Sequence, residues 1–163
     1  MREDGAAIFT DFDSHPVVAN SILWNNSLEI FDLDTSTTVV NHSIVQGGWS
    51  KGTAISTEAP GFWAGINSNQ APTADGDFHL RLSSPAIDAG DDNSIPADFA
   101  DVDGDWDRTE AIETDLDGRP RIAFDAVDMG PYEVQGPLPA VSAVTVSGFS
   151  GQSVTLESHV SDD

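Results

Sequence analysis

The sequence predicts an all-β fold of the solenoid type, with coils of about 22 residues. Three observations carry this prediction. A segment of the chain repeats at that offset. No window keeps the apolar spacing of an amphipathic helix together with its capping residues. Short apolar runs rich in β-branched residues alternate with clusters of Gly, Asn, Asp and Pro, which is typical of strands separated by turns.

The repeat joins "PVVANSILWNN", residues 16–26, to "TVVNHSIVQGG", residues 38–48. The Ile-Phe pair at 8–9 also returns, at 30–31. In a solenoid each residue stacks on its equivalent one turn away, at the spacing of neighbouring strands. We therefore expect Val17 or Val18, together with Ile22, to face inward. The alternative is a coincidence between two unrelated strands. The repeated positions are Val17 and Val39, Val18 and Val40, Ser21 and Ser43, and Ile22 and Ile44.

A weaker third round is expected where Phe62 and Ile66 fall near the repeated positions. The stretch 76–90 then predicts a one-sided strand that buries Phe78, Leu80 and Leu82. It is followed by a tight turn that Ser84 caps.

An acidic loop fills residues 91–120, and residues 119–133 are expected to add a last stretch of core. Residues 1–134 would form the coils and their cap. Residues 135–140 read as a linker, and 141–163 as a short β tail or the start of a truncated further β domain. The residues expected in the last stretch of core are Ile122, Phe124, Val127, Met129 and Tyr132.

The chain is strongly acidic. Its 163 residues carry a formal net charge of −22, and 21 of its acids are Asp against 7 Glu. Such a charge repels nucleic acid and anionic membranes, which excludes both as partners. Asp favours turns, caps and metal-binding loops. No apolar run approaches the roughly 20 residues of a membrane span. Cysteine is absent, which excludes disulfides and thiolate chemistry.

The acidic loop contains the strongest candidate for a metal site, "DVDGDWDRTEAIETDLDG" at 101–118. Calcium takes six to eight hard oxygen ligands from flexible loops, and alternating Asp residues can wrap one ion. Ordering so many carboxylates without a cation is costly. The alternative is a solvated loop held by nearby arginines. The expected calcium ligands are Asp101, Asp103, Asp105, Asp107, Glu110 and Glu113.

Other candidate residues carry weaker patterns. Trp24 and Trp49 both follow the repeated strand and could stack on sugar rings, although packing in the core or a turn is the alternative. Asp88 and Asp128 are single acids in apolar turns, where we expect them to cap backbone N–H groups or to pair with Arg121. No set of residues predicts a catalytic site.

The stretch "LRLSSPAIDAGD…DLDGRPRI…VDMGPYE", within residues 81–133, carries a resemblance. It resembles the C-terminal end of right-handed parallel β-helix proteins from bacterial surfaces, of the choice-of-anchor Q type within the pectate-lyase-like superfamily. This resemblance implies a right-handed parallel β-helix with a loop-rich C-terminal cap. It also implies a secreted or surface-anchored protein, and some members of the wider superfamily act on polysaccharides.

The expected function is a non-catalytic extracellular or cell-surface module, a scaffold or adhesin whose cap is ordered by calcium. One alternative is a filament subunit, joined by β-strand addition through the tail and an open coil edge. Another is a carbohydrate-binding or polysaccharide-lyase-like fragment. The expected partners are a second copy of the chain or a surface polysaccharide. No signal-type apolar core follows Met1, so we expect a segment of a larger protein or a truncated product.

Overall fold

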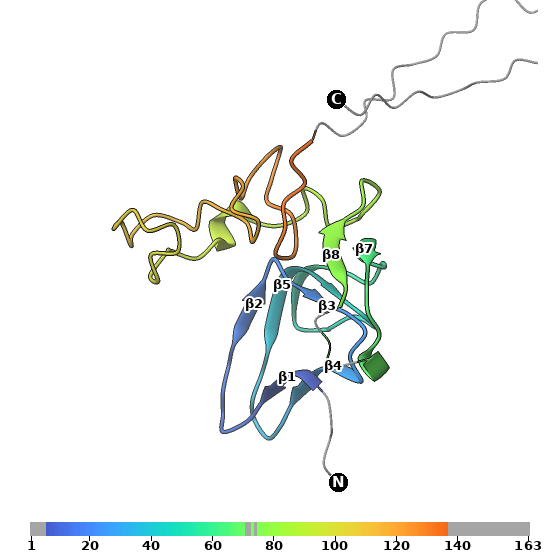
Figure 1. The fold of residues 1–163 in the computed structure, drawn as a ribbon. Helices are drawn as coiled ribbons and strands as arrows, with labels where there is room; N and C mark the ends of the chain where they lie inside the picture. Colours follow the sequence, from blue (N-terminus) through green and yellow to red (C-terminus); the bar gives the residue numbers. More distant parts are fainter. Residues whose placement is uncertain (1–5, 71–72, 74, 137–163) are drawn as a thin grey trace, which may run out of the picture.

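The computed structural model describes residues 6–70, 73 and 75–136, and within them the chain is all-β with no α-helix. Figure 1 shows short strands at one end and a long irregular segment beyond them. Most of the expected linker and the whole 141–163 tail lie outside the described residues. The elements are β1 (Ala6–Thr10), β2 (Val17–Ala19), β3 (Ile22–Leu23), β4 (Leu28–Asp32), β5 (Val39–Val45), β6 (Gly52–Ser56), β7 (Phe62–Ala64), β8 (Asp77–Leu80), and the 3₁₀ helices η1 (Ser68–Gln70) and η2 (Asp92–Ser94).

The predicted repeat is confirmed as the register of parallel strands. β1 pairs with β4, and β2 and β3 both pair with β5, so that two successive passes of the chain lie side by side (Figure 1). Ile8 lies opposite Ile30, and Val18 lies opposite Val40. The sheets themselves are small, with two or four strands each, and none closes on itself.

Apolar side chains of the repeat form the inside of these two passes. Val40, Ile44 and Val45 of β5 are fully buried, because both faces of this central strand are covered. Val18 packs against the cluster that contains Val40, whereas Val17 is 68% exposed. The inward residue of the pair is therefore Val18.

Polar side chains also stack from one pass to the next. The backbone N–H of Ser21 donates to Ser43 Oγ over 3.1 Å, which confirms the expected serine stack. Ser14 N–H donates to Ser36 Oγ in the same way, also over 3.1 Å. Each hydroxyl satisfies a backbone donor that a turn would leave unpaired.

The expected third round at the same offset is wrong. β6 pairs with β5 in parallel, but its residues lie only 12 positions beyond their partners, as Thr53 does beyond Asn41. Gly47 and Gly48, both with positive φ, turn the chain back directly after β5, so this pass is shorter than the two before it. Phe62 instead lies opposite Leu80 in an antiparallel pair of β7 and β8.

The one-sided strand predicted within 76–90, with Phe78, Leu80 and Leu82 on one face, is shorter than expected. β8 ends at Leu80, which is buried, while Phe78 and Leu82 are both exposed. Leu82 falls in the turn closed by the hydrogen bond from Ser84 N–H to Arg81 O. The expected capping by Ser84 is confirmed, because its Oγ accepts from Ala86 N–H over 3.1 Å.

The last predicted stretch of core is correct in its second half only. Val127 and Met129 are buried and Tyr132 is half-buried, but Ile122 and Phe124 are exposed. The reason is that the chain around 121 is anchored by polar contacts rather than by apolar packing. The guanidinium of Arg121 points inward and donates to Glu133 Oε2, Asp128 O and Gly130 O.

Asp88 and Asp128 cap backbone groups, as expected. Asp128 Oδ1 accepts from Asp88 N–H over 2.8 Å, and its Oδ2 accepts from Val134 N–H over 2.9 Å. Asp88 Oδ1 accepts from Asp125 N–H over 3.2 Å. These bonds tie the 82–90 turn to the 125–134 segment. Among the described residues, no helix has the length and apolar character that a membrane crossing requires.

Candidate metal centre

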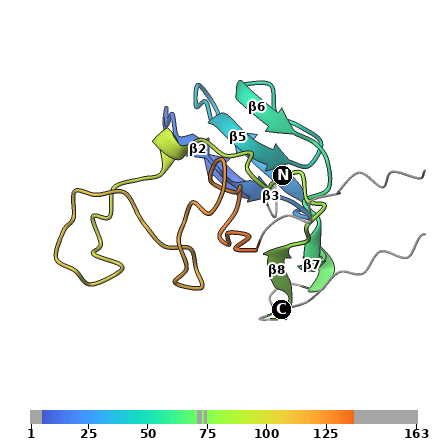
Figure 2. The same cartoon turned by 90° about the horizontal axis from the view of Figure 1, so that it is seen from above.

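The acidic loop is closed by a short antiparallel pairing. Ala97 bridges Ala111, and Asp98 N–H donates to Glu110 O over 2.8 Å. Ile112 N–H donates to Pro96 O over 3.0 Å. Between these paired segments the chain extends away from the strands, as the yellow-to-gold segment does in Figures 1 and 2. The pairing sets Asp98 and Glu110 opposite one another at the base of the loop.

Short hydrogen bonds from backbone to Asp carboxylates fold the loop itself. Asp98 Oδ2 accepts from Val102 N–H over 2.7 Å, and Asp101 Oδ1 accepts from Trp106 N–H over 3.0 Å. Such turns are what Asp residues favour, since the short side chain reaches its own backbone. Gly104, with φ of +80°, allows the bend in the middle.

Two groups of carboxylates converge in this loop. Oxygens of Asp98, Asp103 and Glu110 lie within 4.8 Å of one another, and so do oxygens of Asp101, Asp103 and Asp105. Asp103 belongs to both groups. The first group could hold a metal ion between the base of the loop and its tip.

The first group contains buried carboxylate oxygens that lack a partner. Asp98 is only 3% exposed, yet its Oδ1 accepts no hydrogen bond. Glu110 is half-buried as a residue, but both of its carboxylate oxygens are shielded from solvent and accept no hydrogen bond. Burial, with the negative charges of Asp107 and Asp105, raises the pKa of Glu110 to about 7. Unpaired buried carboxylates are costly. A cation between them would remove that cost, so the residues present fit a metal ion.

The donor set consists of oxygen alone. Hard cations such as Ca²⁺, Mg²⁺ and Mn²⁺ prefer carboxylate and carbonyl oxygen, whereas zinc and copper sites draw on imidazole or thiolate. Three carboxylates supply part of the coordination shell of such an ion. Backbone carbonyls and water usually supply the remainder.

The expected ligands separate into two sets. Asp101, Asp103, Asp105 and Glu110 all belong to one of the two converging groups. Asp107 lies outside both, and its Oδ1 accepts instead from the hydroxyl of Thr109 over 2.7 Å.

Glu113 also lies outside the two groups. Its side chain is exposed, and its backbone carbonyl accepts from Arg121 N–H over 2.7 Å.

Asp98 was not among the residues expected from the sequence. It precedes the alternating run and belongs to "PADFAD", which has the appearance of an ordinary turn. Only the pairing of 96–98 with 110–112 brings it to Glu110, and neither segment has the apolar alternation that predicts a strand. The one available signal in the sequence was that Asp98 lies only a few residues before Asp101, the first of the alternating acids.

Trp24 and Trp49 do not share one cluster. Trp49 packs against the cluster of Ile30, Val40 and Val45, and its Nε1 donates to Thr38 O over 2.8 Å. Trp24 packs against the other cluster. The indole N–H of Trp49 is therefore occupied within the fold.

A second group of ionisable residues surrounds His79 of β8. Nδ1 lies 2.5 Å from Asp77 Oδ1, and Nε2 lies 2.9 Å from Asp117 Oδ2. Tyr132 stacks on the ring, with 4.0 Å between centroids. Hydrogen bonds to Asp117 and Asp77 raise the pKa of His79. With a carboxylate oxygen at each nitrogen, the His79 ring ties β8 to the 115–118 turn, and neither nitrogen is free to act as a base.

Comparison with protein-family models, with curated proteins and with solved structures finds no match for this chain. The candidate site is therefore interpreted from its own geometry.

Proposed function

We propose that the chain is a non-catalytic extracellular or cell-surface module formed by the last coils and the cap of a right-handed parallel β-helix. It would serve as a scaffold or adhesin. The support for the coil is the parallel register, in which residues 22 positions apart in the sequence lie opposite one another. The resemblance of residues 81–133 to surface β-helix proteins supports an extracellular or cell-surface location.

The proposed ligand of the acidic loop is calcium, which orders the cap. The observation that carries this proposal is the set of buried, unpartnered oxygens on Asp98 and Glu110. Calcium suits a flexible loop of carboxylates better than magnesium, which demands a near-ideal octahedron and gives up its water reluctantly. Calcium sites of extracellular modules bind with Kd of about 10⁻⁴–10⁻³ M.

The test is the thermal unfolding of the full chain, followed by circular dichroism with calcium, with magnesium and with chelator. Calcium should raise Tm, because an ion that binds only the folded state stabilises it by mass action. The variant Asp98→Asn should lose most of this rise. Glu113→Gln, which removes an acid outside the two carboxylate groups, is the matched control and should keep it. A Tm that calcium leaves unchanged would refute the metal proposal.

The second candidate function is a filament subunit. Among the described residues β1 and β2 each pair along one edge only, and Phe9 of β1 is 54% exposed while stacking on Phe31 at 5.7 Å. Exposed edges of this kind accept added strands. The alternating sequence 141–163 of a second copy would supply them. Light scattering of the full chain at rising concentration in calcium tests this, and a strictly monomeric species would contradict it.

A further inference from the structure

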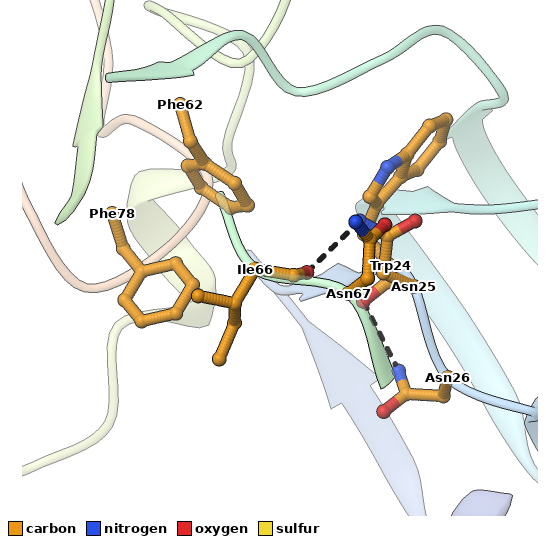
Figure 3. A pocket seen from close by; sticks show the side chains of 7 residues that line it. All are labelled: Trp24, Asn25, Asn26, Phe62, Ile66, Asn67 and Phe78. Carbon is orange, nitrogen blue, oxygen red and sulfur yellow. Dashed lines mark hydrogen bonds between the residues drawn. The ribbon is translucent and has the colours of Figure 1, made fainter. Parts of the chain in front are cut away.

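A cleft lies between the turn that follows β3 and the antiparallel pair of β7 and β8. Its volume is about 210 Å³. Figure 3 shows the rings of Phe62 and Phe78 on one side and Trp24 with the asparagines on the other, with Ile66 between them. It is smaller than the roughly 300–1,000 Å³ of pockets for drug-sized ligands, so it would take one ring rather than an extended ligand.

The aromatic walls of the cleft are held by the core. Trp24 and Phe62 both pack against the buried cluster that contains Ile44 and Leu80. Phe78 meets Phe62 edge to face, with ring centroids 5.3 Å apart and an interplanar angle of 89°. These rings are therefore in place before any ligand arrives, which lowers the entropic cost of binding.

Two asparagines present acceptor oxygens beside the rings. Asn25 Nδ2 donates to Ile66 O over 3.0 Å, and Asn26 Nδ2 donates to Glu29 Oε2 over 2.5 Å. Both amide nitrogens are used within the fold, which leaves each Oδ1 to accept from a ligand.

A third asparagine has its backbone fixed and its side chain exposed. Asn67 N–H donates to Gln70 Oε1 over 3.0 Å, and its carbonyl accepts from Gln70 N–H over 2.9 Å. Its side-chain amide offers both a donor and an acceptor at the mouth of the cleft.

The cleft also differs from the rest of the molecule in charge. None of the described residues that line it is ionisable, although the chain has 28 acids and six bases. The carboxylate of Glu29 behind Asn26 is buried and both of its oxygens accept from Asn26, so no lining carboxylate meets a ligand cation. A ligand anion would face the field of a chain with net charge −22. The chemistry of the lining therefore selects an uncharged ligand.

We propose that this cleft binds a single uncharged sugar ring. A pyranose has an apolar C–H face that suits an aromatic wall, and hydroxyl groups that donate to amide oxygens. The site includes Trp24 but not Trp49, whose indole N–H is bonded to Thr38 O. It shares no residue with the acidic loop, so it does not depend on the calcium proposal.

The test is a titration of the ¹⁵N-labelled full chain with the methyl glycosides of glucose, galactose, mannose and N-acetylglucosamine, with glucuronic acid as the charged comparison. At least one neutral glycoside should shift the Trp24 indole signal and the Asn25 and Asn67 amide signals. Glucuronic acid should bind at least about tenfold more weakly, because the acidic chain repels it.

Two variants localise the binding. Asn67→Ala should weaken it about tenfold through the lost hydrogen bonds, and Phe78→Leu should weaken it by removing an aromatic wall. Phe124→Ala removes an exposed aromatic side chain outside the cleft and should leave the affinity unchanged. The proposal is overturned if no neutral glycoside shifts these signals, if glucuronic acid binds equally well, or if both cleft variants bind as the unaltered chain does.

Discussion

Thr10 and Asp32, 22 residues apart, are joined by a hydrogen bond of 2.6 Å from Thr10 Oγ1 to Asp32 Oδ1. Asp32 also accepts from the hydroxyl and the backbone N–H of Thr38, and from Lys51 Nζ. Burial alone would raise the pKa of Asp32, but the bonds from Thr10, Thr38 and Lys51 hold it well below its usual value of 3.8. One carboxylate therefore fastens β1, β4 and the start of β5 together.

Replacing this carboxylate should destabilise both passes of the chain. In Asp32→Ala the buried Thr10 and Thr38 lose an acceptor, and we expect the free energy of unfolding in urea to fall by about 1–3 kcal/mol. Because the folded pKa is lowered, the stabilisation is present above pH 3.8 and is lost as the pH falls through the folded pKa. The difference in unfolding free energy between Asp32→Ala and the unaltered chain should therefore decrease as the pH falls below 3.8. Glu58→Gln, at an exposed acid, is the control, and an equal deficit there would contradict the assignment.

The 22-residue register was predictable because stacked positions need matching side chains. Val18 lies opposite Val40 on the neighbouring strand, and the backbone N–H of Ser21 donates to Ser43 Oγ. Because paired positions carry the same residue type, the repeat can be recognised in the amino-acid sequence. The third pass was not predictable from that offset. It depends on a glycine turn at 47–48, which reduces the offset between paired residues to 12. The residues of β6 also differ in type from the β5 residues that they face, so the sequence shows no repeat there.

Arg121 is the cationic partner of a buried carboxylate. Its Nη1 donates to Glu133 Oε2 over 3.0 Å, and the Glu133 side chain is fully buried. In Arg121→Ala that carboxylate loses its partner, and we expect a loss of about 3–5 kcal/mol of stability in urea unfolding. Arg119→Ala, which removes an exposed guanidinium 3.6 Å from Asp117, should cost at most about 1 kcal/mol.

The pH dependence of Arg121→Ala has a definite sign. Burial, together with the charge of Asp128, raises the pKa of Glu133 to about 7. Arg121 lowers this pKa, so its removal places the Glu133 pKa of the variant above 7. A proton on Glu133 removes the need for a cationic partner, so the deficit of the variant should be largest in alkali, shrink as the pH falls towards about 7, and stay constant below it. A deficit that grows in acid would contradict the role given to Glu133.

His79 should stabilise the contact between β8 and the 115–118 turn in acid. Its pKa is raised by Asp117 and Asp77, so its contribution is fully present below its ordinary pKa of 6.5 and is lost as the pH rises through the raised value. His79→Phe keeps a ring against Tyr132 but removes both N–H donors. We expect a deficit below pH 6.5 that disappears in alkali, measured by urea unfolding.

The exposed pair of His15 and Asp13, 3.4 Å apart, provides the control for this variant. His15→Phe should show no comparable loss in acid. A His79→Phe deficit that stays constant with pH would mean that the ring contributes through packing alone.

The candidate metal centre was predictable only where local turns of the chain form it. Alternating Asp residues from 101 to 105 converge because a turn of consecutive short acids bends on its own backbone, which is a local effect. Asp98 meets Glu110 only through a two-strand pairing whose residues lack apolar alternation. Burial of an acid by such a pairing is a tertiary effect, and no local pattern encodes it.

Gly52 is the position where the third pass depends on the absence of a side chain. Its φ is +136°, and a Cβ there would lie 1.7 Å from Val40 O and 2.6 Å from the Val40 carbonyl carbon. Both atoms are backbone of the central strand β5, so no rotamer change relieves the clash. The backbone strain of about 1–3 kcal/mol would add to a lost β5–β6 pairing, and Gly52→Ala should cost more than about 3 kcal/mol in urea unfolding.

The matched control is Gly47→Ala. Gly47 also has a positive φ, of +78°, but a Cβ there meets nothing within 4 Å. The Gly47→Ala variant should lose only about 1–2 kcal/mol of unfolding free energy, because its one cost is the left-handed backbone conformation. The amide of Val40, which donates to Lys51 O over 2.9 Å, should lose protection from hydrogen exchange in Gly52→Ala and keep it in Gly47→Ala. Equal costs and equal exchange in the two variants would show that β6 is not fixed by close approach at Gly52.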